Sequence, residues 1–249
     1  MNSDIIYNYD GSFEGLLCCV FESYDKKEVP ADIILTSSSP LTLFPSKDII
    51  TDSKKADRVL KSIPKKMGLS ALEFVQYAFL TCFDKKELYI LLFMRMGYSI
   101  GPSVMNMLDN KIVNALFKAV KNLNNESHLL KGFIRFSIIN DGLVSQIEPK
   151  NFVLPLLVEH FCLRYPEENF LIYDKTHSMA LIYKPYEPSI IKAQNLVLPK
   201  VDDAQRKFED LWKLYYKTVE IEGRHNPKCR MGHMPKRYWN HITEVSDLT

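Results

Sequence analysis

The residues best suited to chemistry lie near the end of the chain, between Arg224 and His241. This stretch carries several cations and no carboxylate, and aromatic rings and imidazoles are interleaved with the cations. Cations contact nucleic-acid phosphates and flat rings stack on bases, so the stretch predicts a nucleic-acid-binding surface. The residues expected at this surface are Arg224, Asn226, Arg230, His233, Lys236, Arg237, Tyr238 and Trp239.

The same composition leaves a second interpretation open. Arg224, Arg230 and Arg237 are equally suited to capping a helix end or to pairing with carboxylates elsewhere, which would pin the stretch to the body of the protein. Tyr238 and Trp239 are equally suited to filling a groove. The two interpretations are compatible, because a pinned segment makes a better preorganised binding site.

A second candidate surface lies earlier in the chain. We expect a strand over Phe133–Ile139, in which alternation would put Lys131, Phe133 and Arg135 on one face. Two cations and an aromatic ring on one face favour nucleic-acid contact, so Lys131 and Arg135 are candidate site residues. A solvated sheet face is the alternative.

The histidines support weaker hypotheses. His225, Cys229 and His233 recur at regular spacing and could ligate zinc, but a structural zinc site needs four ligands and no fourth lies nearby. His128 and His160 are further candidate site residues, although a histidine on an apolar helix, such as His160, is more often a hydrogen-bonded core residue. We therefore predict no metal site and no cofactor.

The familiar catalytic motifs are missing from the sequence. It contains no phosphate-binding loop, no dinucleotide fingerprint, no HExxH motif and no nucleophile elbow. It has no three-cysteine cluster, so the chain alone does not hold a radical-SAM iron–sulfur centre. Carboxylates are plentiful but cannot be paired from sequence, so the catalytic residues stay unassigned.

Hydrophobic periodicity predicts the elements that carry these residues. A short strand at Ile5–Tyr9 leads into a helix capped by Ser12, and Leu69–Leu123 forms a helical layer. A C-terminal helix begins at Asp202-Asp203 and is expected to end near Gly223, where prolines and a glycine favour a shaped loop. One apolar face of that helix consists of Phe208, Leu211, Trp212, Tyr215, Tyr216 and Val219.

Two β-hairpins are expected between the helical layer and the C-terminal helix. Their strands are predicted at 133–139, 143–148, 170–173 and 179–183. Asn140-Asp141-Gly142 forms the first turn, a helix over 156–165 separates the hairpins, and 185–201 reads as a proline-rich connector. The sequence thus predicts an α+β fold: a β–α element, a helical middle layer, an antiparallel sheet with an inserted helix, and a C-terminal helix with a basic loop.

Size and composition limit the remaining possibilities. The 249 residues are expected to form a single α+β domain, with possible subdivision into 1–127, 128–184 and 185–249. A net charge of +2 means that nucleic-acid affinity must come from a local patch. Five scattered cysteines indicate reduced thiols, the N-terminus does not resemble a signal peptide, and the most apolar run, Leu88–Met94, is too short to span a bilayer. We therefore expect a cytoplasmic protein.

Several motifs resemble one uncharacterised bacterial family. The string N-P-x-x-R-x-x-H-M-P-x-R-Y-W at Asn226–Trp239 is similar to the C-terminal signature of that family. Segments at Tyr9–Gly15, His128–Phe136 and Val153–Phe161 fit it as well, so the resemblance covers the whole chain. Members are grouped with DNA metabolism and DNA repair, and they occur beside a radical-SAM protein or fused to a uracil-DNA glycosylase domain.

The resemblance implies a nucleic-acid-binding accessory protein whose partners are DNA and a radical-SAM protein of DNA repair or modification. Two other functions stay open. One is an enzyme that acts on damaged or modified bases, as a glycosylase does, and a pocket combining a carboxylate with His128 or His233 would favour it. The other is a protein-interaction subunit without DNA contact, in which Arg237 and Trp239 would dock the partner.

Overall fold

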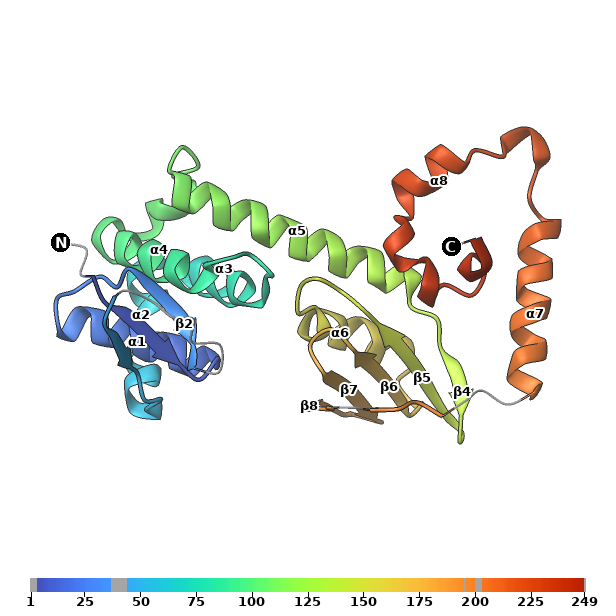
Figure 1. Ribbon diagram of the computed structural model, residues 1–249, viewed down its shortest axis with the longest axis horizontal. Coiled ribbons are helices and arrows are strands. Elements are labelled where there is room, and N and C mark those ends of the chain that lie inside the picture. Colours follow the sequence, from blue (N-terminus) through green and yellow to red (C-terminus); the bar gives the residue numbers. More distant parts are fainter. Residues whose placement is uncertain (1–3, 37–43, 195, 200–202, 249) are drawn as a thin grey trace. The chain divides into compact units, whose positions relative to one another are not determined.

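The computed structural model describes residues 4–36, 44–194, 196–199 and 203–248. The chain groups into two compact units, Met1–Leu123 and Asn124–Thr249. Helix α5 (Lys111–Phe133) contributes its first part to the first unit and its second part to the other. The predicted α+β class is confirmed (Figure 1).

A small parallel sheet lies in the first unit. Its strand order is β2-β1-β3, with β1 at Ile6–Tyr9, β2 at Asp32–Leu35 and β3 at Ser46–Asp48. Helix α1 (Phe13–Asp25) joins β1 to β2, because two parallel strands need a crossover connection. The predicted Ser12 cap is confirmed, since its hydroxyl accepts a hydrogen bond from the Gly15 amide at 2.9 Å.

Helices form the rest of the first unit. They are α2 (Ser53–Met67), α3 (Leu69–Leu80), α4 (Lys86–Ile100), the 3₁₀ helix η2 (Gly101–Asn106) and the first part of α5. Their apolar faces meet around fully buried side chains such as Ile63, Phe93 and Leu116. The predicted helical layer is therefore confirmed, and α5 continues past its expected end at Leu123.

Helices α4 and η2 form the most apolar segment. Lys86–Asn106 is the one helical run among the described residues that is long and apolar enough to cross a membrane. Ile90, Leu91, Phe93 and Met94 on it are completely buried in the core of the first unit. These four side chains form the core-facing side of the segment, which accounts for their apolar character.

The second unit is built on a five-stranded mixed sheet. Its strands are β4 (Ser137–Ile139), β5 (Gly142–Ile147), β6 (Phe170–Asp174), β7 (Met179–Lys184) and β8 (Glu187–Lys192), in that spatial order. Asn140 and Asp141 have φ values of 49° and 59°, which is the turn geometry that suits the twist of a hairpin. Strands β5 and β6 pair in parallel, and α6 (Leu154–Arg164) is their crossover.

Three details of the predicted sheet are wrong. Lys131 and Phe133 lie in the last turns of α5, so the expected strand face with Arg135 does not form. The helix extends this far because its apolar stripe continues through the buried Leu130. The two hairpins join through a parallel pair, and the expected connector at 185–201 contains β8.

A chain of helices ends the second unit. Helix α7 (Asp203–Thr218) is followed by α8 (Pro227–His233) and by three short 3₁₀ helices (Figure 1). The 3₁₀ helices are η3 (Glu222–Arg224), η4 (Lys236–His241) and η5 (Ser246–Leu248). The expected start of α7 at Asp203 is confirmed, Asp202 lies outside the described residues, and α7 ends before Gly223. The prolines break the segment as predicted, because Pro227 opens α8 and Pro235 precedes η4, but the expected loop is wrong in that most of it is helical and Gly232 lies inside α8.

The turn between β1 and α1 depends on one carboxylate. Asp10 accepts hydrogen bonds from the amide of Ser12 at 2.8 Å, from its hydroxyl at 2.6 Å, and from the hydroxyl of Thr51 at 2.8 Å. Partial burial tends to raise the pKa of the Asp10 carboxyl, but the hydrogen bonds from Ser12 and Thr51 outweigh burial and lower it.

We predict that Asp10→Asn lowers the free energy of unfolding at pH 7 by about 0.5–1 kcal/mol, because hydrogen bonds to an ionised group are lost and solvent screens this exposed carboxylate. The pKa of Asp10 is lower in the folded state than in the unfolded state, so its contribution is present above an ordinary pKa of about 3.9 and is lost as the pH falls through the folded value. Urea denaturation should therefore show a smaller difference in the free energy of unfolding between wild type and Asp10→Asn at pH 3 than at pH 7. The exposed Asp109→Asn serves as the control, and a difference that does not depend on pH would contradict this role.

Candidate nucleic-acid interface

A buried carboxylate on α5 organises the second unit. Glu126 is only 2% exposed. Its Oε2 atom accepts hydrogen bonds from the backbone amide of Asn151 at 2.8 Å and from the Asn151 side chain at 2.6 Å, and its Oε1 atom accepts one from the Lys150 amide at 3.0 Å. These bonds fasten the loop before α6 to α5.

The same carboxylate also holds the C-terminal segment. The Arg237 guanidinium lies 3.1 Å from Glu126 Oε1, and the Tyr238 hydroxyl donates to that oxygen at 3.3 Å. Arg237 also donates to the Tyr238 hydroxyl and lies over the ring, with 4.5 Å between the guanidinium carbon and the ring centroid. Burial, reinforced by the negative charge of Glu126, raises the pKa of Tyr238 to about 12, so the phenol keeps its proton and acts as a donor.

Tyr238 and Trp239 fill the interior of this unit. Both side chains are 4% exposed. The Tyr238 ring packs against Phe133 at 5.5 Å between centroids, and the Trp239 indole donates to the Met234 carbonyl at 2.8 Å. The groove-filling interpretation therefore describes both rings in this structure. We refer to Arg237, Tyr238 and Trp239 as the C-terminal anchor.

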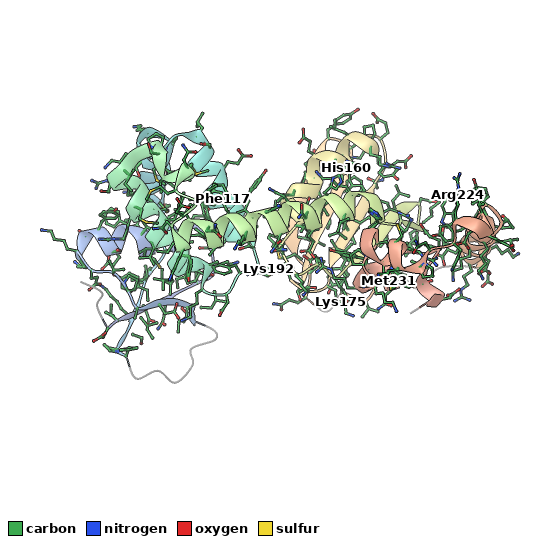
Figure 2. All side chains as sticks on the ribbon, turned by 90° about the horizontal axis from the view of Figure 1, so that it is seen from above. Phe117, His160, Lys175, Lys192, Arg224 and Met231 are labelled. Atoms are coloured by element: carbon green, nitrogen blue, oxygen red, sulfur yellow. The ribbon has the colours of Figure 1, made fainter. Side chains whose placement is uncertain are left out.

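Among the described residues, the other cations of the segment are not paired with a carboxylate, although the Lys236 ammonium lies 5.5 Å from the centroid of the Trp239 ring. We name Arg224, Lys228, Arg230 and Lys236 the free cations. Arg230 is half-buried and the other three are exposed, and in the part of the chain that the structure describes none of the four lies within ion-pair distance of a carboxylate. Figure 2 shows Arg224 and Met231 on this segment. The two interpretations of the arginines thus divide between residues: Arg237 pins the segment, whereas Arg224 and Arg230 do not.

The remaining predicted residues of the segment have different positions. Asn226 caps α8 by accepting a hydrogen bond from the Cys229 amide at 2.9 Å, so its side chain shapes the segment. His233 is exposed at the end of α8. Lys131 is half-buried on α5.

Arg135 belongs to a second ion pair. Its guanidinium makes two hydrogen bonds to Glu244, from Nη2 at 2.6 Å and from Nε at 3.2 Å. The Trp212 indole donates to the same carboxylate at 3.2 Å. Burial tends to raise the pKa of Glu244, but the hydrogen bonds from Arg135 and Trp212 lower it below its usual range. Arg135 is therefore engaged in joining β4 to the end of the chain.

The predicted histidines do not lie together in one site. His128 is exposed on α5. His160 lies on α6 (Figure 2), and its buried Nε2 atom makes no hydrogen bond to the described residues. Burial and the nearby charges of Lys131 and Arg164 lower the pKa of His160. His225 pairs with Glu220 at 2.5 Å, and no group of three His, Cys, Asp or Glu side chains among the described residues could hold a metal ion.

A polar cavity of about 270 Å³ lies in the second unit, against β4, β5, α7 and η4. Its ionisable residues are Arg135, Glu209, Lys213 and His241. It contains a carboxylate and an imidazole, but neither His128 nor His233 lines it. The arrangement that would favour a base-modifying enzyme is therefore not formed at this cavity.

Sequence reasoning missed Glu126, the central residue of the site. The available signal was its position on an apolar stripe, because the buried Leu123 and Leu130 lie three and four residues away on the same face of α5. A carboxylate on such a face must find donors, and the donors come from segments distant in sequence.

The fold and this site define an α+β protein in which a buried carboxylate holds the C-terminal segment that carries the free cations. Residues 84–244, more than half of the chain, match the family model described as a domain of unknown function (DUF4130). The chain belongs to this family, and the matched range includes Glu126, the anchor and the free cations. Searches among curated proteins and among solved structures gave no match.

We predict that Glu126→Ala releases the C-terminal anchor. The substitution leaves the buried donors of Asn151 and Tyr238 without an acceptor, at a cost of about 1–3 kcal/mol for each unsatisfied group. In a Trp212→Phe background Trp239 is the single tryptophan, so its fluorescence should shift to longer wavelength as the ring meets water.

Glu159→Ala, which removes an exposed carboxylate from α6, is the matched control and should leave the spectrum unchanged. An unshifted Trp239 spectrum in Glu126→Ala would show that Glu126 does not hold the anchor.

Proposed function

We propose that this protein binds nucleic acid as an accessory factor of DNA repair or modification, and that the free cations contact phosphate. The observation that carries the proposal is that one short segment combines cations without carboxylate partners, three of the four exposed, with the buried rings of Tyr238 and Trp239. Exposed cations without carboxylate partners keep their full attraction for a polyanion.

The anchor improves the site by ordering it. A flexible basic tail loses conformational entropy when it binds, and each immobilised side chain costs about 0.5–1.5 kcal/mol. Here Arg237, Tyr238 and Trp239 fix the end of the segment before any ligand arrives, and Asn226 caps α8. The net charge of +2 makes this local patch the source of the affinity.

The structure changes the roles that the sequence assigned. Phosphate contact is proposed for Arg224, Lys228, Arg230 and Lys236, whereas Arg237, Tyr238 and Trp239 act as structural residues. The resemblance of the motifs to a family grouped with DNA repair supports DNA as the ligand and a radical-SAM protein as the partner. Reduced cysteines support a cytoplasmic location.

The test is fluorescence anisotropy of labelled single- and double-stranded DNA across a salt series. The variant Arg224→Ala/Lys228→Ala/Arg230→Ala should bind more weakly. Its slope of log affinity against log salt should fall by about 2–3, since each phosphate contact contributes roughly 0.7–0.9.

The matched control removes three exposed lysines from α5, as Lys111→Ala/Lys118→Ala/Lys121→Ala, with the same change in net charge. Equal slopes for the two triple variants would mean that the affinity follows overall charge, and the free cations would then not be the binding site.

A second candidate function is protein docking through α7. No residue of this helix is buried, and Phe208, Leu211 and Tyr215 are 70%, 60% and 55% exposed. The polar face of α7 makes the inward contacts, because Glu209 bonds to Ser137 at 3.3 Å and Lys213 to Asp247 at 2.9 Å. An exposed apolar helix face of this kind favours a protein partner.

We expect α7 to carry any complex with the radical-SAM protein implied by the resemblance. Phe208→Ala/Leu211→Ala should abolish co-elution of the two proteins in size-exclusion chromatography, and the wild-type complex should persist in 1 M salt because apolar contacts are not screened. Lys207→Ala/Asp210→Ala on the same helix is the control. A complex that survives the apolar double variant would exclude α7 as the docking element.

A further inference from the structure

The first unit contains a cavity that the proposed function does not use. It measures about 630 Å³ and opens among α1, α2 and α4. Val20, Phe21 and Val59 form an apolar wall. A cavity of this size falls in the range of small-molecule sites, which is about 300–1,000 Å³.

Three cations line this cavity. Arg58 and Lys66 come from α2, eight positions apart on one face together with Ser62, and Arg95 comes from α4. None of the three cations forms an ion pair within the described residues. The lining carboxylate, Asp25, is paired with Lys26 at 2.9 Å.

Aromatic rings hold these cations in place. The guanidinium of Arg95 lies 4.7 Å from the centroid of Tyr24, and its Nη1 atom donates to the buried Ser23 hydroxyl at 2.7 Å. The ammonium of Lys66 lies 5.4 Å from the centroid of the Tyr98 ring, and the guanidinium of Arg58 lies 5.7 Å from that of Phe21. The Tyr98 hydroxyl in turn bonds to Ser62 at 2.7 Å.

These features restrict the class of ligand. Three cations without ion-pair partners at one cavity favour an anion, and the guanidinium groups of Arg58 and Arg95 suit the oxygens of a phosphate. The cavity exceeds the size of a phosphate ion, and its apolar wall and three rings fit a flat organic group. The cations and the apolar wall line the same cavity, so a single molecule with a phosphate and a flat ring would contact both.

We propose that this cavity binds a nucleoside phosphate. Arg58, Lys66 and Arg95 contact the phosphate, and the base lies against the wall made by Phe21 and its apolar neighbours. A free nucleotide and the phosphorylated end of a nucleic-acid strand share this chemistry. The site lies in the first unit and involves none of the free cations. Failure of the proposed function would therefore leave this proposal intact, and the reverse is also true.

The test is isothermal titration calorimetry of the full chain with adenosine 5′-monophosphate, adenosine and inorganic phosphate. The nucleotide should bind with one site per chain and at least tenfold more tightly than adenosine or phosphate alone. Arg58→Gln/Lys66→Gln should weaken this binding at least tenfold. Both side chains are exposed, so the variant should keep its fold, which circular dichroism checks.

Lys61→Gln/Lys65→Gln is the matched control, because it removes two lysines from the same helix outside the cavity, and its affinity should stay within twofold of wild type. The proposal is overturned if none of the three compounds binds, if phosphate binds as tightly as the nucleotide, or if the two double variants behave alike.

A further pair of ligands identifies the source of the phosphate. Oligothymidine with and without a 5′-phosphate is titrated in the Arg224→Ala/Lys228→Ala/Arg230→Ala background, which removes most of the free cations. Tighter binding of the phosphorylated strand than of the mononucleotide assigns the cavity to strand ends. Tighter binding of the mononucleotide assigns it to a free nucleotide.

Discussion

The second unit depends on one buried carboxylate. Glu126 collects donors from the loop at Lys150 and Asn151 and from the C-terminal residues Arg237 and Tyr238. A carboxylate with 2% exposure is costly unless its oxygens are satisfied, and this site satisfies them with bonds from both segments. The C-terminal segment is thus held in position because the buried Glu126 carboxylate needs hydrogen-bond donors.

This constraint separates the structural residues of the basic motif from the residues that we propose contact phosphate. Arg237 forms an ion pair with Glu126, and the rings of Tyr238 and Trp239 are buried in the interior. The other cations lie on η3, α8 and η4, and among the described residues they form no ion pair with a carboxylate. The proposed polyanion binding rests on the charge of these residues, and the anchor would preorganise them.

Local patterns determined which parts were predictable. The Ser12 cap, the Asn140–Gly142 turn and the proline breaks each depend on neighbouring residues, and the structure has all three. The wrong predictions concern distant contacts. The parallel pairing of β5 with β6 and the burial of Tyr238 beside Glu126, 112 residues away, have no signal in a single window of sequence. The composition of the basic stretch was informative, but it could not show which arginine is paired.

Hydrogen–deuterium exchange with mass spectrometry, with and without a DNA oligonucleotide, tests the central claim most directly. Amides at 238–242 should exchange slowly in the free protein, because Tyr238, Trp239 and Ile242 are buried before DNA binds. Amides at 224–236 should exchange faster in the free protein and become protected when DNA is added. Fast exchange at 238–242, or DNA-dependent protection that leaves 224–236 unchanged, would contradict the account.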